Sequence, residues 1–240
     1  MVAVNGLPVS VAADGVLLLG GGAGIVVHDE ALCTLTAMGH DSTGRLIGFT
    51  AAQCGGPGSS VIAEGAEDHG AVGSVVAADA GLGYAVIEFD PLKVKPIADY
   101  EGFGIYGIGS AAMDSSGGGP VVGAEPGAPE SGAAESEASE PVAPQAAGPA
   151  DIRVCRLGRG SGLDCFDFGP AGIDLAGQQW WKPGDDGAPV TVDDRIVGMV
   201  RGASVPSAPL DQPGSGMALF KVILDDLNAK GGPGSGFGLG

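Results

Sequence analysis

Residues 33–54 read CTLTAMGHDSTGRLIGFTAAQC and contain two apolar runs joined by a polar turn. The runs are Cys33–Met38 and Leu46–Thr50, and the turn HDSTG between them occupies residues 40–44. Short apolar runs bounded by Gly, Asp and Ser predict two strands of a β-hairpin. A cysteine stands at each end of the stretch, and the second one completes the pattern T-A-A-x-C. This stretch predicts a β-rich fold.

Apolar runs of the same kind continue on both sides of this hairpin, with Gly- and Pro-rich turns between them. Residues 1–113 show no sustained helical period. The further runs are Gly24–Val27, Val72–Ala77, Tyr84–Phe89, Phe103–Ile108, Ile152–Cys155, Pro189–Val192 and Ile196–Val200. We therefore expect an all-β protein with two β-rich halves, residues 1–113 and residues 151–229.

Three segments depart from the strand pattern. Residues 217–229 carry apolar side chains at steps of three and four, which predicts a terminal helix. Its apolar face consists of Met217, Phe220, Ile223, Leu224 and Leu227. Residues 114–150 are mostly Pro, Ala, Gly, Glu and Ser, a composition that predicts a disordered acidic linker. Residues 230–240 are rich in glycine and are expected to be a flexible tail.

The overall composition narrows the class of protein. The 240 residues include 46 glycines and 17 prolines with 5% aromatic residues, which is typical of short strands and tight turns. A net charge of −18 argues against nucleic acid or an anionic membrane surface as a partner. The apolar residues 16–27 are too few and too glycine-rich to span a bilayer. We expect no membrane span and a monomer.

The number and spacing of the cysteines indicate the cellular compartment in which the protein folds. Cys33, Cys54, Cys155 and Cys165 form an even set without a C-x-x-C spacing, which favours two disulfides over a zinc site. Their number alone leaves three pairings open. No basic signal segment is visible, because the first Lys or Arg is Arg45. A chain whose signal has been removed fits these facts best, so we expect a protein that is secreted or lies in the cell envelope.

Three stretches together resemble the trypsin/chymotrypsin-like serine proteases. Residues 33–54 end in T-A-A-x-C, which is similar to the T-A-[AG]-H-C segment carrying the catalytic histidine of that family. Residues 183–190, PGDDGAPV, resemble its nucleophile loop P-G-D-S-G-G-P-V. Residues 154–165, VCRLGRGSGLDC, resemble V-C-R-S-G-x-T-x-G-x-x-C of the bacterial branch that contains streptogrisins and α-lytic protease.

The three matches occur in the order of the family and, with the sequence between them, cover most of residues 15–229 apart from the linker. The resemblance implies a chymotrypsin-like double β-barrel with a C-terminal helix. It also implies the disulfides Cys33–Cys54 and Cys155–Cys165, each worth on the order of 3 kcal/mol. A third disulfide of the family has no counterpart, and Trp180 stands at its cysteine position.

The resemblance places the catalytic residues of the family at three positions that are replaced in this chain. The histidine position of T-A-A-x-C is Gln53, whose amide forms hydrogen bonds but cannot act as a base. The family's D-Y-[AG]-[IV]-V strand matches GYAVI, so Gly83 stands where the aspartate is expected. The serine of G-D-S-G-G is Asp186. We expect a chain without an intact Ser-His-Asp triad.

The oxyanion hole implied by the resemblance consists of the backbone N–H groups of Gly184 and Asp186. Loss of a triad costs roughly a millionfold in turnover, and what remains depends on the oxyanion hole. A carboxylate on Asp186 competes for those donors and repels a developing oxyanion. The resemblance therefore predicts that even the residual catalysis is compromised.

The histidines offer no obvious replacement for the missing base. His28, His40 and His69 are each expected in a surface turn or loop, where a solvated role is the simpler interpretation. Asp79 lies near Gly83 in the sequence, but without a histidine at position 53 it has nothing to orient.

Two charged residues of the resemblance are present. In the bacterial branch, the aspartate before the nucleophile pairs with the arginine of V-C-R, and these positions are Asp185 and Arg156 here. A partly buried charge needs a partner, so we expect an ion pair. The alternative is two unrelated surface charges.

Two further features have competing interpretations. Trp180 and Trp181 flank the entrance of the family's primary specificity pocket, where they form either an aromatic platform or core filling. The aspartates at 185, 186, 193 and 194 are of the type that binds calcium. Asp193-Asp194 reads more simply as a hairpin turn, so we expect neither a metal nor a cofactor.

The sequence thus favours an inactive serine-protease homologue that binds an unknown protein or peptide, or has a structural role, outside the cytoplasm. One alternative is an active trypsin-like endopeptidase with a displaced triad. Another is a scaffold whose function lies in the acidic linker of residues 114–150.

Overall fold

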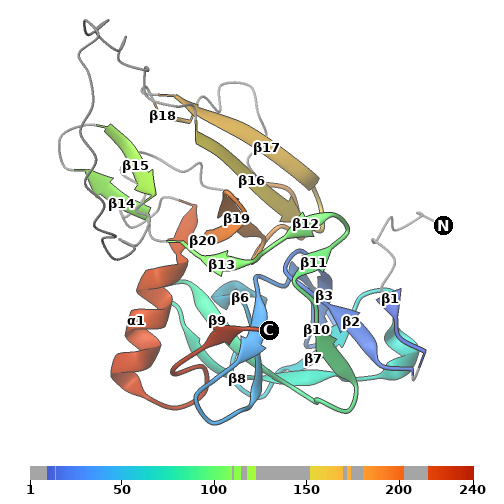
Figure 1. The fold of residues 1–240 in the computed structure, drawn as a ribbon. Helices are drawn as coiled ribbons and strands as arrows, with labels where there is room; N and C mark the ends of the chain where they lie inside the picture. The colour runs from blue at the N-terminus through green and yellow to red at the C-terminus, as the bar shows by residue number, and fades with distance from the viewer. Residues whose placement is uncertain are drawn as a thin grey trace, which may run out of the picture.

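The computed structural model describes residues 10–13, 15–109, 111–114, 118–122, 152–169, 172–173, 181–202 and 216–240. Within these residues the chain is almost entirely β, with a single α-helix near the C-terminus (Figure 1). The strands form two large curled sheets, one from each half of the sequence. The smaller strand pairs lie around them.

The N-terminal half is built on an eight-stranded sheet. Its strands are β3 Gly24–Val27, β4 Ala31–Thr34, β5 Met38–His40, β6 Leu46–Ala51, β7 Ser60–Ala63, β8 Gly73–Asp79, β9 Tyr84–Phe89 and β22 Gly238–Leu239. They follow the order β22-β5-β6-β9-β8-β7-β3-β4, and every neighbouring pair is antiparallel. All six residues of β6 are buried, so this strand lies at the centre of the sheet's packing.

The C-terminal half is built on a seven-stranded sheet. Its strands are β13 Gly107–Ile108, β16 Ile152–Gly158, β17 Gly162–Gly169, β18 Gly172–Ile173, β19 Pro189–Val192, β20 Arg195–Val200 and β21 Met217–Leu219. They follow the order β13-β20-β19-β16-β17-β18, and β21 also pairs with β20. The turn between β19 and β20 is Asp193-Asp194, and both residues adopt positive φ as in a tight hairpin. The hairpin turn predicted for these two residues is confirmed.

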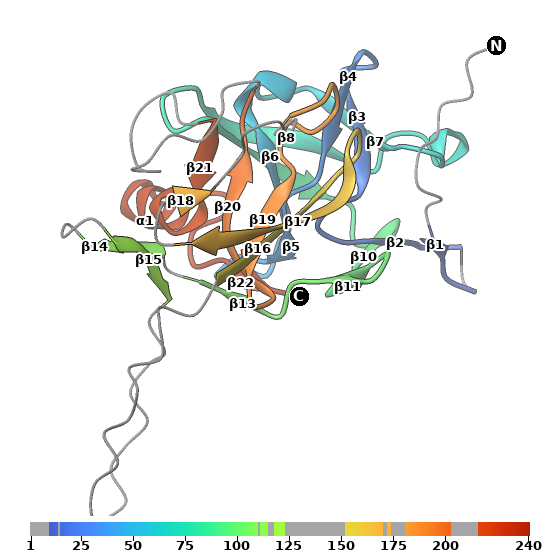
Figure 2. The same cartoon turned by 90° about the horizontal axis from the view of Figure 1, so that it is seen from above.

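Three small groups of strands complete the β structure. They are β1 Ser10–Val11, β2 Leu17–Leu19 and β10 Val94–Pro96; β11 Asp99–Tyr100 and β12 Phe103–Gly104; and β14 Ala111–Asp114 and β15 Gly118–Val122. The hairpin of β14 and β15 projects from the side of the molecule (Figure 2). It occupies the start of the segment expected to be a linker. Residues 123–150 lie outside the described residues, so the linker stays a prediction for them.

The predicted terminal helix is present as α1, Phe220–Lys230, and the residues before it form β21 instead of its first turn. Its apolar face packs on the N-terminal half, although it follows the C-terminal half in sequence. The helix residues in that core are Phe220, Ile223, Leu224 and Leu227. Figure 1 shows α1 running beside β6, β9 and β8.

The flexible tail predicted for residues 230–240 is wrong. Residues 238–239 form β22, which pairs with β5, and Phe237 is buried in the same core as the helix. The composition misled the prediction because one aromatic side chain anchors an otherwise glycine-rich segment. A single buried phenylalanine contributes as much apolar area as several small residues.

Polar contacts fasten the helix to the sheet as well. Lys230 lies between the carboxylates of Asp79, at 2.8 Å, and Asp226, at 2.7 Å. The hydroxyl of Tyr84 on β9 donates to Asp226 at 2.6 Å. Burial, together with the neighbouring Asp226, raises the pKa of Tyr84 to about 12. The hydrogen bond from Lys230 holds the pKa of Asp79 below its ordinary value.

The two halves share contacts at several points. The guanidinium of Arg159, in the turn between β16 and β17, donates from Nε to both carboxylate oxygens of Glu64, just after β7. The Thr36 hydroxyl donates to the Gly187 carbonyl at 2.6 Å. Both contacts join a residue of the first half to a residue of the second. In the described part of the chain, no helix has the length and apolar character needed to cross a membrane.

Candidate functional site

The loop of residues 181–188 sits at the junction between the halves. The Thr34 N–H donates to the Asp186 carbonyl at 2.8 Å, and the Thr34 hydroxyl donates to the Gly184 carbonyl at 2.7 Å. On the other side, the Gly187 N–H donates to the Val200 carbonyl at 2.8 Å. The loop is therefore held between β4 of the first half and β20 of the second.

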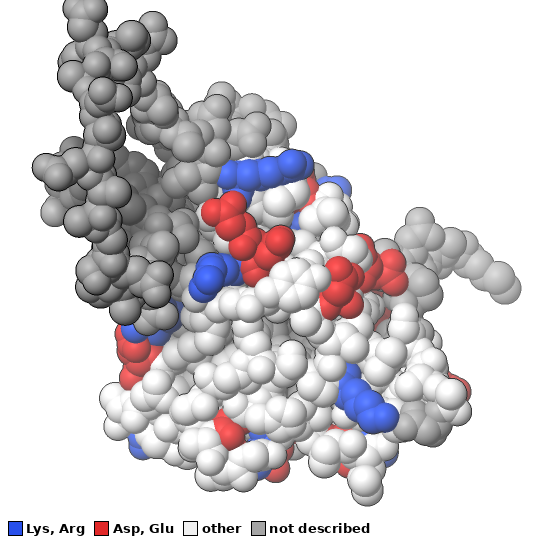
Figure 3. All heavy atoms as spheres, viewed as in Figure 1, with Lys and Arg blue, Asp and Glu red and all other residues white. Residues whose placement is uncertain are grey.

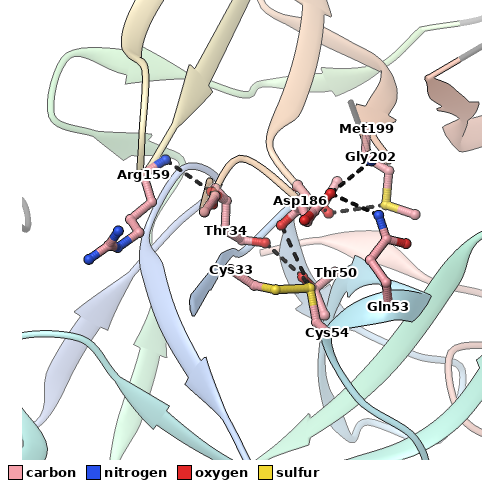
Figure 4. The surroundings of a disulfide bond; sticks show 12 residues. Cys33, Thr34, Thr50, Gln53, Cys54, Arg159, Asp186, Met199 and Gly202 are labelled. Carbon is pink, nitrogen blue, oxygen red and sulfur yellow. Dashed lines mark hydrogen bonds between the residues drawn. A yellow bond between two sulfur atoms is a disulfide. The ribbon is translucent and has the colours of Figure 1, made fainter. Parts of the chain in front are cut away.

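The Cys33–Cys54 disulfide lies directly beside this loop (Figure 4). Cys33 is the residue before Thr34, and Cys54 ends the short helical turn η1, Ala52–Cys54. The bond therefore ties the strand that supports the loop to the turn that carries Gln53. The second disulfide, Cys155–Cys165, joins β16 to β17. Both pairings implied by the resemblance are confirmed.

The side chain of Asp186 receives hydrogen bonds from three separate segments. Its Oδ1 atom accepts from the Gln53 amide nitrogen at 2.8 Å, from the Trp181 indole nitrogen at 3.1 Å and from the Gly202 N–H at 2.7 Å. Figure 4 shows Gln53 and Gly202 both facing this carboxylate. Two of the three positions at which the resemblance expects catalytic residues, Gln53 and Asp186, are thus in direct contact.

Gly83, the third position named by the resemblance, is hydrogen-bonded to the residue before Gln53. Its carbonyl accepts the Ala52 N–H at 3.0 Å, just before β9 begins. Gly83 has a φ of 79°, and a Cβ built on it would lie 2.7 Å from the Arg201 Cδ atom. A side chain at this position is therefore disfavoured both by the backbone conformation and by the arginine that covers it.

Arg201 is a residue of the site that the sequence analysis missed. It lies at the end of β20, next to Gly202, and its Nη1 atom donates to the Gly81 carbonyl at 3.3 Å. Its aliphatic part covers Gly83, so the space beside Gln53 holds the stem of a basic residue. No motif of the sequence marked this residue, because its position next to Gly83 arises only when β20 and β9 come together.

Asp185 and Arg156 are brought together beneath the loop. Arg156 Nη1 lies 3.4 Å from Asp185 Oδ2, and both side chains are buried. Asp185 also accepts backbone N–H groups at both oxygens: Gly160 and Ser161 donate to Oδ1, and Lys182 donates to Oδ2, each at 2.8–2.9 Å. The carboxylate therefore fixes the start of the loop and the turn between β16 and β17 at once.

Two backbone donors of the loop make no hydrogen bond within the described part of the chain. These are the N–H groups of Gly184 and Asp186, the pair that the resemblance assigns to the oxyanion hole. Gly184 has a φ of 97°, in the region that favours glycine. Backbone N–H groups without an internal partner are available to an external carbonyl oxygen.

No imidazole takes part in the contacts of this site. His28 lies in the turn after β3, His40 ends β5 instead of lying in the turn after it, and His69 lies in the short helical turn η2, Glu67–His69. Asp79, the conceivable substitute orienter, is paired with Lys230. The side chains that meet Asp186 in the described part of the site are an amide and an indole, both of which donate hydrogen bonds to it.

Two other predictions about the site have separate outcomes. Trp181 is half-buried and packs against the C-terminal core, and its indole N–H donates a hydrogen bond to Asp186. The residue therefore contributes to core packing and to the site. Trp180, expected at the position of the missing disulfide, lies outside the described residues. Among the side chains that are described, no group of three His, Cys, Asp or Glu residues is arranged to hold a metal ion.

No protein-family model matches the chain, and no curated protein matches it by sequence. Solved structures do resemble it. The chain is similar to the Nocardiopsis protease NAPase, with a TM-score of 0.51 and 15% identity over 88% of this chain and 96% of that one. It is also similar to Thermobifida fusca Protease A, with a TM-score of 0.52 and 14% identity over 93% and 100%.

A third similar structure is a glutamic acid-specific serine protease, with a TM-score of 0.50 and 14% identity over 88% of this chain and 97% of that one. At such identities the likeness concerns the fold, because folds carry many functions. The fold of this chain is the chymotrypsin-like double β-barrel that the sequence predicted.

Proposed function

We propose that this chain is a non-catalytic homologue of serine proteases that acts outside the cytoplasm by binding an extended peptide or protein segment in its cleft. The single observation that carries the proposal is the hydrogen bond between Gln53 and Asp186. At the two positions where a protease of this fold needs a base and a hydroxyl, the chain has an amide that donates to a carboxylate. Neither group can begin an acyl transfer.

The surroundings of Asp186 support the same conclusion. Three donors converge on one of its oxygens, so the carboxylate is held in place instead of being free to act as a nucleophile. The covering of Gly83 by Arg201 leaves no room for an orienting carboxylate without rearrangement. A triad restored by a single substitution is therefore not expected.

A binding role is supported by the open N–H groups of Gly184 and Asp186. They remain available to a carbonyl oxygen of a bound chain even though the catalytic side chains are replaced. The two disulfides support a location outside the cytoplasm, since such bonds persist in oxidising compartments.

The absence of catalysis is tested by labelling the full chain with a fluorophosphonate, which reacts with activated serines. We expect no label above that of heat-denatured protein. Labelling of any serine at the rate of an active protease would overturn the proposal and favour the displaced-triad alternative.

The assignment of positions is tested by restoring the triad. Because a Cβ at position 83 would lie 2.7 Å from the Arg201 Cδ atom, the substitutions Gln53→His, Gly83→Asp and Asp186→Ser are combined with a fourth change, Arg201→Ser. We expect the fastest fluorophosphonate labelling in the fourfold variant. The matched control keeps Arg201 and should label far more slowly, because the new aspartate then lacks room.

The binding role is tested by backbone hydrogen exchange in the presence of a library of extended peptides. The amides of Gly184 and Asp186 should exchange quickly in the free chain and be protected when peptide is added. The amides of Asp193 and Asp194, in an exposed turn, serve as controls and should not change. Equal behaviour of both pairs would contradict a peptide-binding cleft.

A further inference from the structure

The C-terminal residues occupy a socket on the N-terminal half that has the features of a peptide-binding site. Phe237 is the centre of this contact. Its ring lies 4.9 Å from the Phe49 ring and 6.1 Å from the Phe220 ring, both edge-to-face. The Phe49 and Phe220 ring centroids are themselves 5.2 Å apart, so the three rings form one aromatic cluster between β6, α1 and the C-terminal segment.

The backbone around Phe237 is held by strand addition. Gly238 and Leu239 pair antiparallel with His40 and Gly39 of β5, whose other edge pairs with β6. The Ser42 N–H donates to the Ser235 carbonyl at 2.9 Å. Figure 2 shows β22 lying along β5 at the edge of the sheet. This is the mode in which many proteins bind extended peptides, with backbone bonds for affinity and one side chain for specificity.

Two side chains of the socket also accept hydrogen bonds from the backbone of the C-terminal segment. Asn228 Oδ1 accepts the Gly236 N–H at 2.7 Å, and Asp41 Oδ2 accepts the Gly234 N–H at 3.3 Å. A Cβ on Gly39 would collide with the Gly238 carbonyl, so glycine at position 39 permits the close approach of the added strand. A Cβ on Gly236 would lie 2.8 Å from the Ser42 Cβ atom, whereas a Cβ on Gly238 would meet nothing within 4 Å. The site therefore restricts side-chain bulk directly before the aromatic residue of its ligand.

Apart from its continuity with α1, the segment is held by no disulfide and no ion pair among the described residues. Residues 231–240 read GGPGSGFGLG, with no charged residue and no cysteine, and Gly231 caps the helix with a φ of 70°. The face around the socket is poor in charge as well. Figure 3 shows few charged side chains over β5 and β22, whereas charged groups gather over the elements above them. The ligand chemistry that fits is therefore uncharged.

We propose that this socket, formed by β5, Phe49, Phe220, Asn228 and Asp41, is a strand-addition site for an uncharged, glycine-rich peptide with one aromatic side chain. Residues 231–240 are its resident ligand, and such a peptide displaces them. The site is separate from the cleft around Asp186. Because the resident segment is tethered, its effective concentration is roughly millimolar, and an external peptide competes against that.

The socket is connected to the cleft through β6. Phe49 is two residues before the end of this strand, and η1 with Gln53 follows directly. Occupation of the socket therefore supports the strand that leads into η1, which carries Gln53.

The test uses full-length chains and a fluorescein-labelled decapeptide with the sequence of residues 231–240, followed by fluorescence anisotropy. In the Phe237→Ala chain the resident segment loses its anchor, so we expect the decapeptide to bind about 100-fold more tightly than to the unaltered chain. The same decapeptide with alanine at its phenylalanine position should bind neither chain. A Leu239→Ala chain, altered at a half-buried position, should show a gain of about tenfold or less.

Hydrogen exchange gives an independent readout. The amides of β5 should exchange faster in the Phe237→Ala chain and recover protection when the decapeptide is added. Phe237→Leu is the milder second variant if the alanine chain does not fold. The proposal is overturned if a folded variant binds the decapeptide no better than the unaltered chain. It is equally overturned if neither variant folds, because the segment would then be a fixed part of the barrel.

Discussion

Asp185 and Asp186 are neighbours in the sequence but belong to two different regions of the molecule. Asp185 points into the interior, where Arg156 and three backbone N–H groups surround it. Asp186 is half-buried, and Gln53, Trp181 and Gly202 donate to it. The first carboxylate holds the loop together, and the second stands where the resemblance places the serine of the family.

The difference shows that the scaffold of the loop and the chemistry of the loop are separable. The interior contacts require charges of fixed sign at fixed positions, because an unpaired buried charge is strongly destabilising. The cleft contacts are ordinary hydrogen bonds between half-exposed groups, which other residue pairs can replace at small cost. The fold can therefore persist after the reactive groups are exchanged. Four substitutions test this contrast.

The largest effect is expected at Arg156. Arg156→Met leaves the Asp185 charge buried without its partner, which costs about 3–5 kcal/mol of unfolding free energy. Chemical denaturation measured by circular dichroism provides the value. Adding Asp185→Asn to the variant removes the orphaned charge and should recover part of the loss. A cost below that of a typical surface substitution would place this pair among ordinary surface contacts.

The next effect concerns Asp41, a second interior carboxylate. Burial acts to raise its pKa, but hydrogen bonds from Thr43 and Arg45 outweigh burial and hold the pKa well below its usual range. A carboxyl with a lowered pKa stabilises the fold above its unfolded pKa of about 4, and this contribution is lost as the pH falls further. Stability should therefore decline from about pH 5 to about pH 2.

Asp41→Asn is the variant that checks this origin. It should cost about 2 kcal/mol near neutral pH and make the decline in acid shallower. Asp68→Asn, at an exposed position, is the matched control and should leave the pH profile unchanged. Identical acid profiles for the Asp41 variant and the unaltered chain would show that other carboxyls dominate.

A smaller effect is expected at Gly83, in the cleft. Gly83→Ala forces a side chain into a positive φ and against Arg201, which should cost about 1–2 kcal/mol. Thermal unfolding is a sufficient measurement. The double variant with Arg201→Ala should recover the part due to the contact and keep the part due to the backbone. If the double variant recovers nothing, Arg201 does not press on this position.

The smallest effect is expected at Asp186 itself. Asp186→Asn keeps an oxygen that accepts the three donors, so the unfolding free energy should change by about 1 kcal/mol or less. The decisive measurement compares the unfolding free energies of Asp186→Asn and Arg156→Met under identical conditions. Equal costs for the two variants would remove the distinction between the scaffold and the cleft.

Much of the fold follows from local signals in the sequence. The runs at residues 24–27, 84–89 and 189–192 became strands because short apolar segments between turn-formers have few other ways to bury their side chains. The turn at Asp193-Asp194 was visible between two such runs, and the helix predicted for residues 217–229 was visible from its apolar side chains at steps of three and four. Motif resemblance supplied the disulfide pairing, which spacing alone left open.

What the sequence concealed depends on contacts between distant segments. Arg201 and Gly202 carry no motif, and their roles beside Gly83 and Asp186 exist only after the halves come together. The docking of residues 231–240 was missed because glycine-rich composition usually indicates disorder. An isolated aromatic residue in such a segment, Phe237, was the one available signal.

The return of α1 and β22 to the N-terminal half has a consequence for synthesis on the ribosome. The core of this half includes Phe220 and Phe237, so it cannot close until the chain has been translated beyond residue 237. At about 5–20 residues per second, that is on the order of ten seconds after the strands of the first half have been made. During this interval the nascent chain lacks its finished barrel, and the apolar side chains of its first half remain without their final cover.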